Sequence, residues 1–435
     1  MSITDSQYFC VLPWIHMNLN PDGAVTLCCQ SHDKIIDAEG RALNAQTHSL
    51  ADVWNAPAMR DIRRDMSDGK LRPACKACVG SESFDRLSHR TYLNMVWLKQ
   101  RGSGTAIAKA IDDSRDWEAP APHYVDFRLG NLCNLKCTAC KPLYSSQIER
   151  DPVHAQWVPN DAPYTRLHHR FGNQAMDWQE ADELADEIIA LSGSLSLIQL
   201  AGGEPTINKT QIALLQRIVD HGSADGIDLE VVTNLSNVRQ DVFDLYARFR
   251  SLTVALSIDG VGATYEYVRY PGRWSSLTHN IARLRKTRPN VDLKINAVLQ
   301  AVNALGIVEL IDWACEQDIR IYVSIGRGLD HYNDIRILPP TVRGLMRRQF
   351  EEFYARKAQW LAHVPTFRPN IESILNEIEA TDFTEDVRRE RIVSFMQFVN
   401  DMDASRGLSF RSIAPETYEG IVKVHGYWDQ ATRYA

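Results

Sequence analysis

Nine cysteines stand in two groups and one isolated position, with spacings typical of metal ligands. They are too few for a disulfide scaffold in 435 residues, and an odd number cannot all pair. Three of them, Cys133, Cys137 and Cys140, fall within eight residues. Three thiolates on one loop can each bind one iron of a cubane 4Fe-4S cluster, which leaves the fourth iron open to a substrate or cofactor. Zinc is the alternative, although it usually takes four protein ligands in paired two-residue spacings.

The second group lies near the N-terminus and offers four thiolates. Cys10 and Cys28 flank a predicted β-hairpin with its turn at residues 21–23, so the hairpin would bring these two cysteines together. Cys75 and Cys78 have the two-residue spacing that clamps one metal centre. A set of four cysteine thiolates suits an iron-sulfur cluster and suits zinc equally well.

Two cysteines remain outside these sets. Cys29 could replace Cys28 as a ligand, and Cys315 lies within a predicted helix, where we expect a buried small side chain. Other side chains offer general bases, but their spacing does not select one of them. These candidates are His123, Asp126 and His331.

The elements that must position these residues are strands and helices in alternation. β-rich runs are predicted at 124–129, 195–200, 228–234, 252–258, 291–298 and 320–325. Amphipathic helices are predicted between them, at 181–191, 209–221, 275–286 and 304–316. Such alternation predicts a parallel α/β sheet with right-handed crossovers, either open or closed as a barrel. Ligand-binding residues should then collect at the C-terminal ends of the strands.

The flanking segments differ from this repeat. The cysteine-bearing N-terminal part contains a helix-like stretch at 49–68, and small and Pro-rich residues place a boundary near 120. Helices are predicted at 342–361, 371–380 and 384–402. We therefore expect an N-terminal domain with its linker at 1–119, an α/β domain at 120–335 and a helical C-terminal segment at 336–435.

The three-cysteine loop, placed at the end of the first α/β strand, resembles the signature of the radical S-adenosylmethionine (SAM) superfamily. The resemblance implies a partial (β/α)6 barrel. It also implies that SAM binds the open iron of a catalytic 4Fe-4S cluster, which an external donor such as flavodoxin or ferredoxin reduces. Cleavage of SAM then gives a 5′-deoxyadenosyl radical that abstracts a substrate hydrogen. One departure is Ala139, since the superfamily usually has a large side chain before the third cysteine.

Further segments at successive strand ends resemble the SAM-binding parts of the family. Gly202-Gly203-Glu204-Pro205 resembles the segment that receives the methionine amino group, since glycine permits close approach and a carboxylate suits an ammonium. Arg269 resembles the basic residue that pairs with the methionine carboxylate. Ser257 and Asp259 resemble ribose contacts. The third strand end contributes Thr233 and Asn234.

The N-terminal cysteines resemble the twitch or SPASM domain, an auxiliary cluster-binding module. The resemblance implies that Cys10, Cys28, Cys75 and Cys78 hold one auxiliary iron-sulfur cluster, which we expect to be 4Fe-4S. In most of the family this module follows the barrel, whereas here it precedes it. We therefore take from this resemblance the type of ligand but not the connectivity of the module to the barrel.

The composition of the chain argues against several classes of function. The net charge of −7 argues against a general nucleic-acid or anionic-membrane partner, and no apolar run is long enough to span a membrane. No signal peptide is indicated at the N-terminus, so we expect a cytoplasmic protein. We expect a radical enzyme whose substrate is a small molecule, with peptide modification as the alternative. A zinc-stabilised binding protein is the non-enzymatic alternative.

Overall fold

The structure is a computed structural model. It describes residues 2–31, 34–83, 87–157, 182–326, 332–380 and 383–425. Two compact units emerge from its internal contacts. The first draws its described residues from Met1–Asn131, Gly172–Val232 and Arg239–Thr253, and the second from Leu132–Phe171, Thr233–Val238 and Val254–Ala435.

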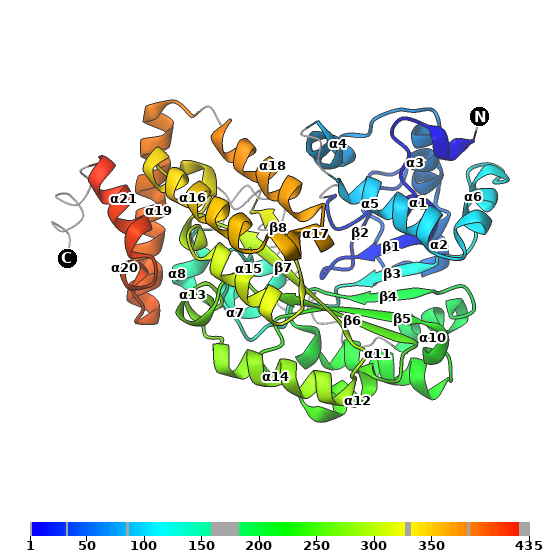
Figure 1. Cartoon of the computed structure of the whole chain (residues 1–435). Coiled ribbons are helices and arrows are strands. Elements are labelled where there is room, and N and C mark those ends of the chain that lie inside the picture. Colours follow the sequence, from blue (N-terminus) through cyan, green and yellow to red (C-terminus); the bar gives the residue numbers. More distant parts are fainter. Residues whose placement is uncertain are drawn as a thin grey trace. The chain divides into compact units, whose positions relative to one another are not determined.

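The first unit is built on a mostly parallel sheet. Its strands are β1 (His16–Leu19), β2 (Val25–Thr26), β3 (Tyr124–Phe127), β4 (Leu197–Leu200) and β5 (Asp228–Thr233). β1, β3, β4 and β5 pair in that order and in parallel, whereas β2 is antiparallel to β1 (Figure 1). The predicted hairpin is therefore present, and its first strand extends the sheet alongside β3. This pairing of β1 with β3 was not predicted from the sequence.

Side-chain alternation explains why β1 and β3 fit this position. Met17 and Leu19 on β1, and Val125 and Phe127 on β3, are at most 2% exposed and supply the apolar face. The residues between them are polar or amphipathic and are buried as well, so both faces of these strands are covered. The turn after β1 uses Gly23 at φ +78°, a backbone conformation that glycine adopts without steric cost.

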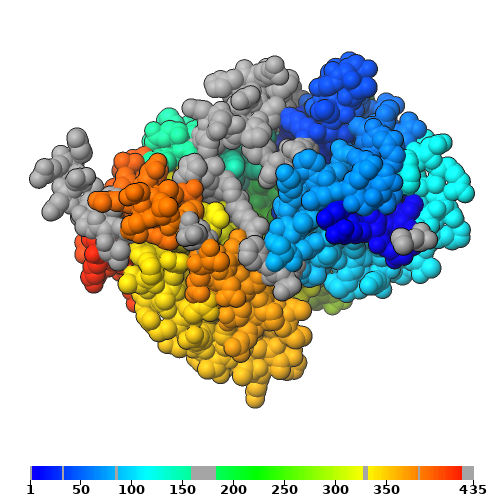
Figure 2. All heavy atoms as spheres, turned by 90° about the horizontal axis from the view of Figure 1, so that it is seen from above, coloured from blue at the N-terminus to red at the C-terminus, as the bar shows by residue number. Residues whose placement is uncertain are grey.

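Short helices accompany this sheet. They are α1 (Leu12–Ile15), α2 (Leu50–Trp54), α3 (Pro57–Ser67), α4 (Lys76–Glu82), α5 (His89–Met95), α6 (Gly104–Asp112), α10 (Asp182–Leu191), α11 (Lys209–Asp220) and α12 (Gln240–Tyr246). The single helix predicted over 49–68 is two helices, α2 and α3. Pro57 begins the second one because a proline disfavours helical backbone in the residue before it. The N-terminal segment forms a contiguous blue-to-cyan surface in Figure 2.

The second unit contains a parallel strand pair and the C-terminal helices. β6 (Ser251–Ser257) passes from the first unit into the second, and β7 (Asp292–Leu299) pairs in parallel with β8 (Arg320–Ile325). The helices between the strands are α7 (Ser146–Glu149), α8 (Pro152–Ala155), α13 (Gly262–Val268), α14 (Trp274–Thr287) and α15 (Ile307–Glu316). All six predicted α/β strands and the four helices between them are present. The predicted α/β class is confirmed.

The predicted helical C-terminal segment is also present. It contains α16 (Pro340–Arg356), α17 (Ala358–His363), α18 (Phe367–Glu379), α19 (Glu385–Arg406), α20 (Phe410–Ile413) and α21 (Pro415–His425). The helix predicted over 342–361 is split at Lys357 into α16 and α17. In the part of the chain that is described, no helix combines the length and apolar character that a membrane span requires.

Candidate metal centres

The loop with Cys133, Cys137 and Cys140 follows β3 and is fixed by backbone pairing. The Lys136 N–H donates to the Tyr270 carbonyl at 2.6 Å, and the Thr138 N–H donates to the Val268 carbonyl at 2.9 Å. The Thr138 hydroxyl also donates to Gln300 Oε1 at 2.8 Å. The loop is therefore held on both sides of Cys137 by segments more than 120 residues later in the chain.

Donors approach the sulfur atoms of Cys133 and Cys137. The Leu135 N–H is 3.5 Å from Cys133 Sγ, and Arg269 Nη1 is 3.8 Å from Cys137 Sγ. Burial raises the pKa of the Cys137 thiol, and the Arg269 charge opposes that rise. Burial and the neighbouring Cys137 raise the pKa of Cys140 to about 12. Binding of iron would lower the pKa of these thiols, because a cation favours the thiolate form.

Asp259 and Arg269 form a buried ion pair. Arg269 Nη2 donates to Asp259 Oδ2 at 2.8 Å, and the side chains are 11% and 1% exposed. The other oxygen, Oδ1, accepts the Val298 N–H at 2.8 Å. The two residues predicted to contact the ribose and the methionine carboxylate thus contact each other. Arg269 Nε has no hydrogen-bond partner among the described residues, so it is a donor available to an anionic group.

The remaining predicted SAM contacts of this unit are near the loop or on the strand ends. Asn234 Nδ2 donates to Asn134 Oδ1 at 3.0 Å and is 4.0 Å from Cys133 Sγ. Thr233 is buried, and its hydroxyl accepts the Leu235 N–H at 2.8 Å. Ser257 is the last residue of β6 and is partly exposed. Asn234 is therefore brought to the cysteine loop, whereas Thr233 shapes the turn after β5.

The Gly-Gly-Glu-Pro segment follows β4 in the first unit. Gly202 has φ +104°, and a Cβ there would lie 3.1 Å from Arg128 Cα and 3.2 Å from the Gly130 carbonyl oxygen. Only glycine fits such a close approach. Glu204 is buried, and its Oε1 accepts the Thr206 N–H at 3.1 Å and the Thr206 hydroxyl at 2.6 Å. Pro205 begins the short helix Pro205–Ile207.

The four N-terminal cysteines line one hollow in the first unit. The predicted hairpin does bring Cys10 and Cys28 to the same place, and Cys75 and Cys78 reach it from the start of α4. Burial raises the pKa of Cys10 to about 12, with Cys75 and Cys78 adding to the rise. Burial also raises the pKa values of Cys28 and Cys78. Cys10 is buried, and the other three thiols are partly exposed. Clustered thiols in this setting are costly as thiolates unless a cation is present, which is the chemistry of a metal site.

No three Cys, His, Asp or Glu side chains in the described ranges meet at metal-ligand distance. The thiols share a hollow without converging on one point, and all nine are free cysteines. The donor type and number fit an iron-sulfur cluster. The assignment of individual cysteines as ligands stays a prediction.

Cys29 contacts a histidine, His89. Its sulfur is 3.6 Å from His89 Nε2, and His89 also lines the hollow. Although burial opposes the change, the His89 charge and hydrogen bond lower the pKa of Cys29. Cys315 lies in α15, is partly exposed and stands apart from both cysteine sets along the chain.

The residues that support the cysteines were not identifiable from the sequence. Gln300 fixes the three-cysteine loop, while Arg90 and Asn94 on α5 contact the chain around Cys10. Their partners lie more than 80 residues away in the sequence, so no local spacing could have identified them.

Two of the proposed general bases have partners. Asp126 pairs with Arg128 at 2.8 Å, and His123 Nδ1 is 3.0 Å from the Ser194 carbonyl oxygen. Burial lowers the pKa of His123. His331 lies outside the described residues.

Parallel α/β strands followed by a three-thiol loop, with four more thiols around a hollow, fit an α/β protein of the iron-sulfur class. Residues 127–314 match the sequence model of the radical SAM superfamily. Residues 10–79 match that of SPASM, an iron-sulfur cluster-binding domain. The chain therefore carries a radical SAM region with an SPASM-type domain ahead of it. A radical SAM region and an SPASM domain together imply 4Fe-4S clusters and SAM as cofactors.

Known proteins are similar to parts of the chain. A GTP 3',8-cyclase of Caulobacter vibrioides is 27% identical over 194 residues, which are 44% of this chain and 48% of that protein. The chain thus spans about half the length of this curated relative. Streptococcus suis SuiB bound to precursor peptide SuiA is 17% identical, with a TM-score of 0.37 over 55% of this chain and 46% of that one. Native anSMEcpe with bound AdoMet is 14% identical, with a TM-score of 0.39 over 54% and 61%.

Proposed function

We propose that this protein cleaves SAM reductively at a cluster held by Cys133, Cys137 and Cys140 and abstracts a hydrogen atom from its substrate. The observation that carries the proposal is the three-thiol loop itself, anchored by backbone bonds to residues 268–270 and approached by Arg269. When bound there, a reduced cluster would supply the one electron that cleaves SAM to methionine and a 5′-deoxyadenosyl radical. Such a cluster also requires an external reductant, such as flavodoxin or ferredoxin.

The residues of the chain would bind and orient SAM around this loop. Arg269 offers its unpartnered Nε to a carboxylate, while Asp259 holds the guanidinium in place. Asn234 braces the loop next to Cys133. As the sequence resemblance implies, the Gly202 backbone and Glu204 are proposed to receive the methionine amino group, because a buried carboxylate suits an ammonium.

We propose that Cys10, Cys28, Cys75 and Cys78 hold an auxiliary iron-sulfur cluster that takes an electron from the substrate or binds it. Four cysteine ligands would saturate one 4Fe-4S cluster. The free thiols of this chain fit a reducing compartment, so we place the protein in the cytoplasm.

We propose a small molecule as the substrate, with a peptide side chain as the alternative. The first hundred residues are occupied by the cysteine module. The curated relative is named for a reaction of GTP, a small molecule, which favours the same class here. A short precursor-peptide gene beside this one would instead support peptide modification.

Anaerobic purification tests the class of protein. The expected preparation is brown and contains about eight iron and eight sulfide per chain. With SAM and a strong reductant it should form 5′-deoxyadenosine. Zinc in place of iron would overturn the proposal and support the zinc-stabilised binding protein.

Replacing one loop cysteine tests the site. Cys133→Ala should reduce 5′-deoxyadenosine formation to the background level, because a cluster that needs three thiolates loses one of them. Cys315→Ala is the matched control, since this cysteine lies in α15 and outside both sets. Product from Cys133→Ala at the control's rate would show that the loop is not the site of cleavage.

A further inference from the structure

We propose that α5 belongs to the auxiliary-cluster site, with Arg90 and Asn94 as positioning residues for the cysteines and with Arg90 raising the reduction potential of the cluster. The inference rests on the proposed function, since it takes the four N-terminal cysteines as cluster ligands. α5 lies beyond the residues 10–79 that match the SPASM domain.

Asn94 holds the backbone on both sides of Cys10. Its Nδ2 donates to the Phe9 carbonyl at 3.0 Å, and its Oδ1 accepts the Val11 N–H at 2.8 Å. The backbone at 9–11 is therefore fixed by both ends of one amide. Because Phe9 and Val11 are 2% and 0% exposed, water cannot replace these bonds easily.

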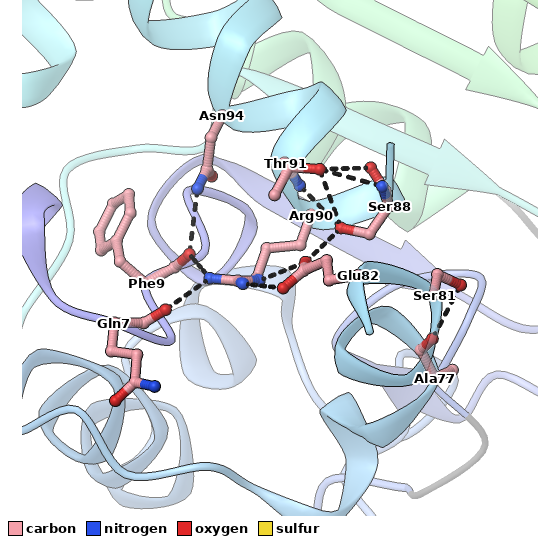
Figure 3. Close-up of polar contacts among 9 residues, drawn as sticks. All are labelled: Gln7, Phe9, Ala77, Ser81, Glu82, Ser88, Arg90, Thr91 and Asn94. Atoms are coloured by element: carbon pink, nitrogen blue, oxygen red, sulfur yellow. Dashed lines mark hydrogen bonds and ion pairs between the residues drawn. The ribbon is translucent and has the colours of Figure 1, made fainter. Parts of the chain in front are cut away.

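Arg90 links the same segment to the helix that carries Cys78. Its Nη1 donates to the Phe9 carbonyl at 3.0 Å and to the Gln7 carbonyl at 3.1 Å. Its Nε donates to Glu82 Oε1 at 3.2 Å, and its Nη2 pairs with Glu82 Oε2. Glu82 is the last residue of α4, the helix that begins next to Cys75 and contains Cys78. Figure 3 shows the guanidinium between the two carbonyls and the carboxylate.

The start of α5 is fixed independently of the cysteines. Ser88 and Thr91 form a capping box, in which each side chain accepts the other residue's backbone N–H. The Ser88 hydroxyl also donates to Glu82 Oε1. Arg90 therefore acts from a rigid helix start, and it clamps one segment carrying Cys10 and another carrying Cys78.

The charge of Arg90 lies where it can act on a cluster. Arg90 and His89 both line the hollow with the four cysteines, and the Arg90 side chain is only 11% exposed. Reduction adds a negative charge to a cluster, so a nearby buried cation favours the reduced form and raises its reduction potential. Glu82 is part of the same pair and opposes this effect.

The experiment isolates the auxiliary cluster. The parent is the full-length Cys133→Ala/Cys137→Ala/Cys140→Ala variant, whose remaining iron belongs to the N-terminal cysteines. Iron content, the rate of iron loss to a chelator and the midpoint potential from an EPR-monitored redox titration are measured. Arg60→Gln is the matched control, because Arg60 forms a surface pair with Glu118 in the same unit.

Opposite shifts distinguish a charge effect from general damage. Arg90→Gln should lower the midpoint potential and Glu82→Gln should raise it, because they remove charges of opposite sign. Arg90→Lys should keep the parent's potential but lose iron about tenfold faster, since an ammonium cannot reproduce the planar fork of bonds. Asn94→Ala should also lose iron faster, with an unchanged potential.

The proposal is overturned if these variants match the parent and Arg60→Gln in both potential and iron loss. It is also overturned if Arg90→Gln and Glu82→Gln shift the potential in the same direction. If Arg90→Gln does not fold, Arg90→Lys and Asn94→Ala still decide the positioning role. A parent that holds zinc would refute the proposed function, and the clamp would then be judged separately by the rate of zinc loss.

Discussion

At the scale of single residues, Asp259 and Arg269 show how a polar site keeps its shape before a ligand binds. The aspartate accepts a backbone N–H from β7 with one oxygen and the guanidinium with the other. Fixing a charged side chain in this way reduces the entropy that binding must overcome. Asp259 thus acts through Arg269, whose Nη1 approaches Cys137 Sγ and whose Nε has no partner among the described residues.

The three cysteines of the loop could be singled out from the sequence because their spacing is local, and their role as ligands stays a prediction. The partners of those cysteines were not predictable, because their contacts join distant segments. Gln300 reaches Thr138 across 162 positions, and Asn94 reaches Val11 across 83. A sequence pattern shows which residues can do chemistry, whereas the fold alone shows which residues hold them.

His154 gives a prediction about pH. It is fully buried, and its Nδ1 accepts from Arg406 Nη2 at 3.0 Å. Burial and the Arg406 charge lower the pKa of His154 to about 3, from 6.5 in an exposed chain. As the pH falls, His154 therefore binds a proton in the unfolded state before it does so in the folded state. The stability that depends on a neutral His154 is complete above pH 6.5 and is lost toward pH 3. When the pH falls from 7 to 5.5, the titration of His154 should lower the free energy of unfolding by about 1 kcal/mol.

Urea unfolding at several pH values checks this prediction. His154→Gln keeps an acceptor for Arg406 but cannot be protonated, so its stability should fall less steeply below pH 6.5. His363→Gln, an exposed substitution on α17, is the control. Identical pH profiles for His154→Gln and the wild-type protein would contradict the assignment.

At the scale of elements, the strands were predictable and the role of the hairpin was not. Each α/β strand has a run of β-branched and apolar residues between turn signals, and all six appear at the predicted places. β1 contains only His16-Met17-Asn18-Leu19, a pattern that fits a free hairpin equally well. Its parallel pairing with β3 depends on residues about 100 positions later, which a local pattern does not encode.

The turn after β4 gives a prediction at this scale. Gly202→Ala should lower the free energy of unfolding by about 2 kcal/mol, because φ +104° is unfavourable for any residue with a Cβ and the backbone of Arg128 is in contact. Gly226→Ala is the matched control, since a Cβ there meets nothing within 4 Å. Urea unfolding compares the two variants. Equal stability would show that the turn after β4 relaxes to accept a side chain.

At the scale of the whole molecule, the two cysteine sets belong to different compact units. The hollow with Cys10, Cys28, Cys75 and Cys78 lies within the first unit, and the loop with Cys133, Cys137 and Cys140 lies within the second. Each set is anchored by hydrogen bonds inside its own unit, through α5 in one case and through residues 268–270 and Gln300 in the other. The support of one site therefore does not depend on the ligands of the other.

Loss of one set should accordingly spare the other. Cys75→Ala/Cys78→Ala should lower the iron content from about eight to about four per chain. It should still form 5′-deoxyadenosine from SAM, although turnover of the substrate should fail. Cys133→Ala/Cys137→Ala should lose a similar amount of iron and form no 5′-deoxyadenosine. Iron and product analysis of both variants, with Cys315→Ala as the control, distinguishes these outcomes. If Cys75→Ala/Cys78→Ala lost all its iron or all cleavage of SAM, the N-terminal cysteines would be required at the catalytic cluster itself, and their auxiliary role would have to be abandoned.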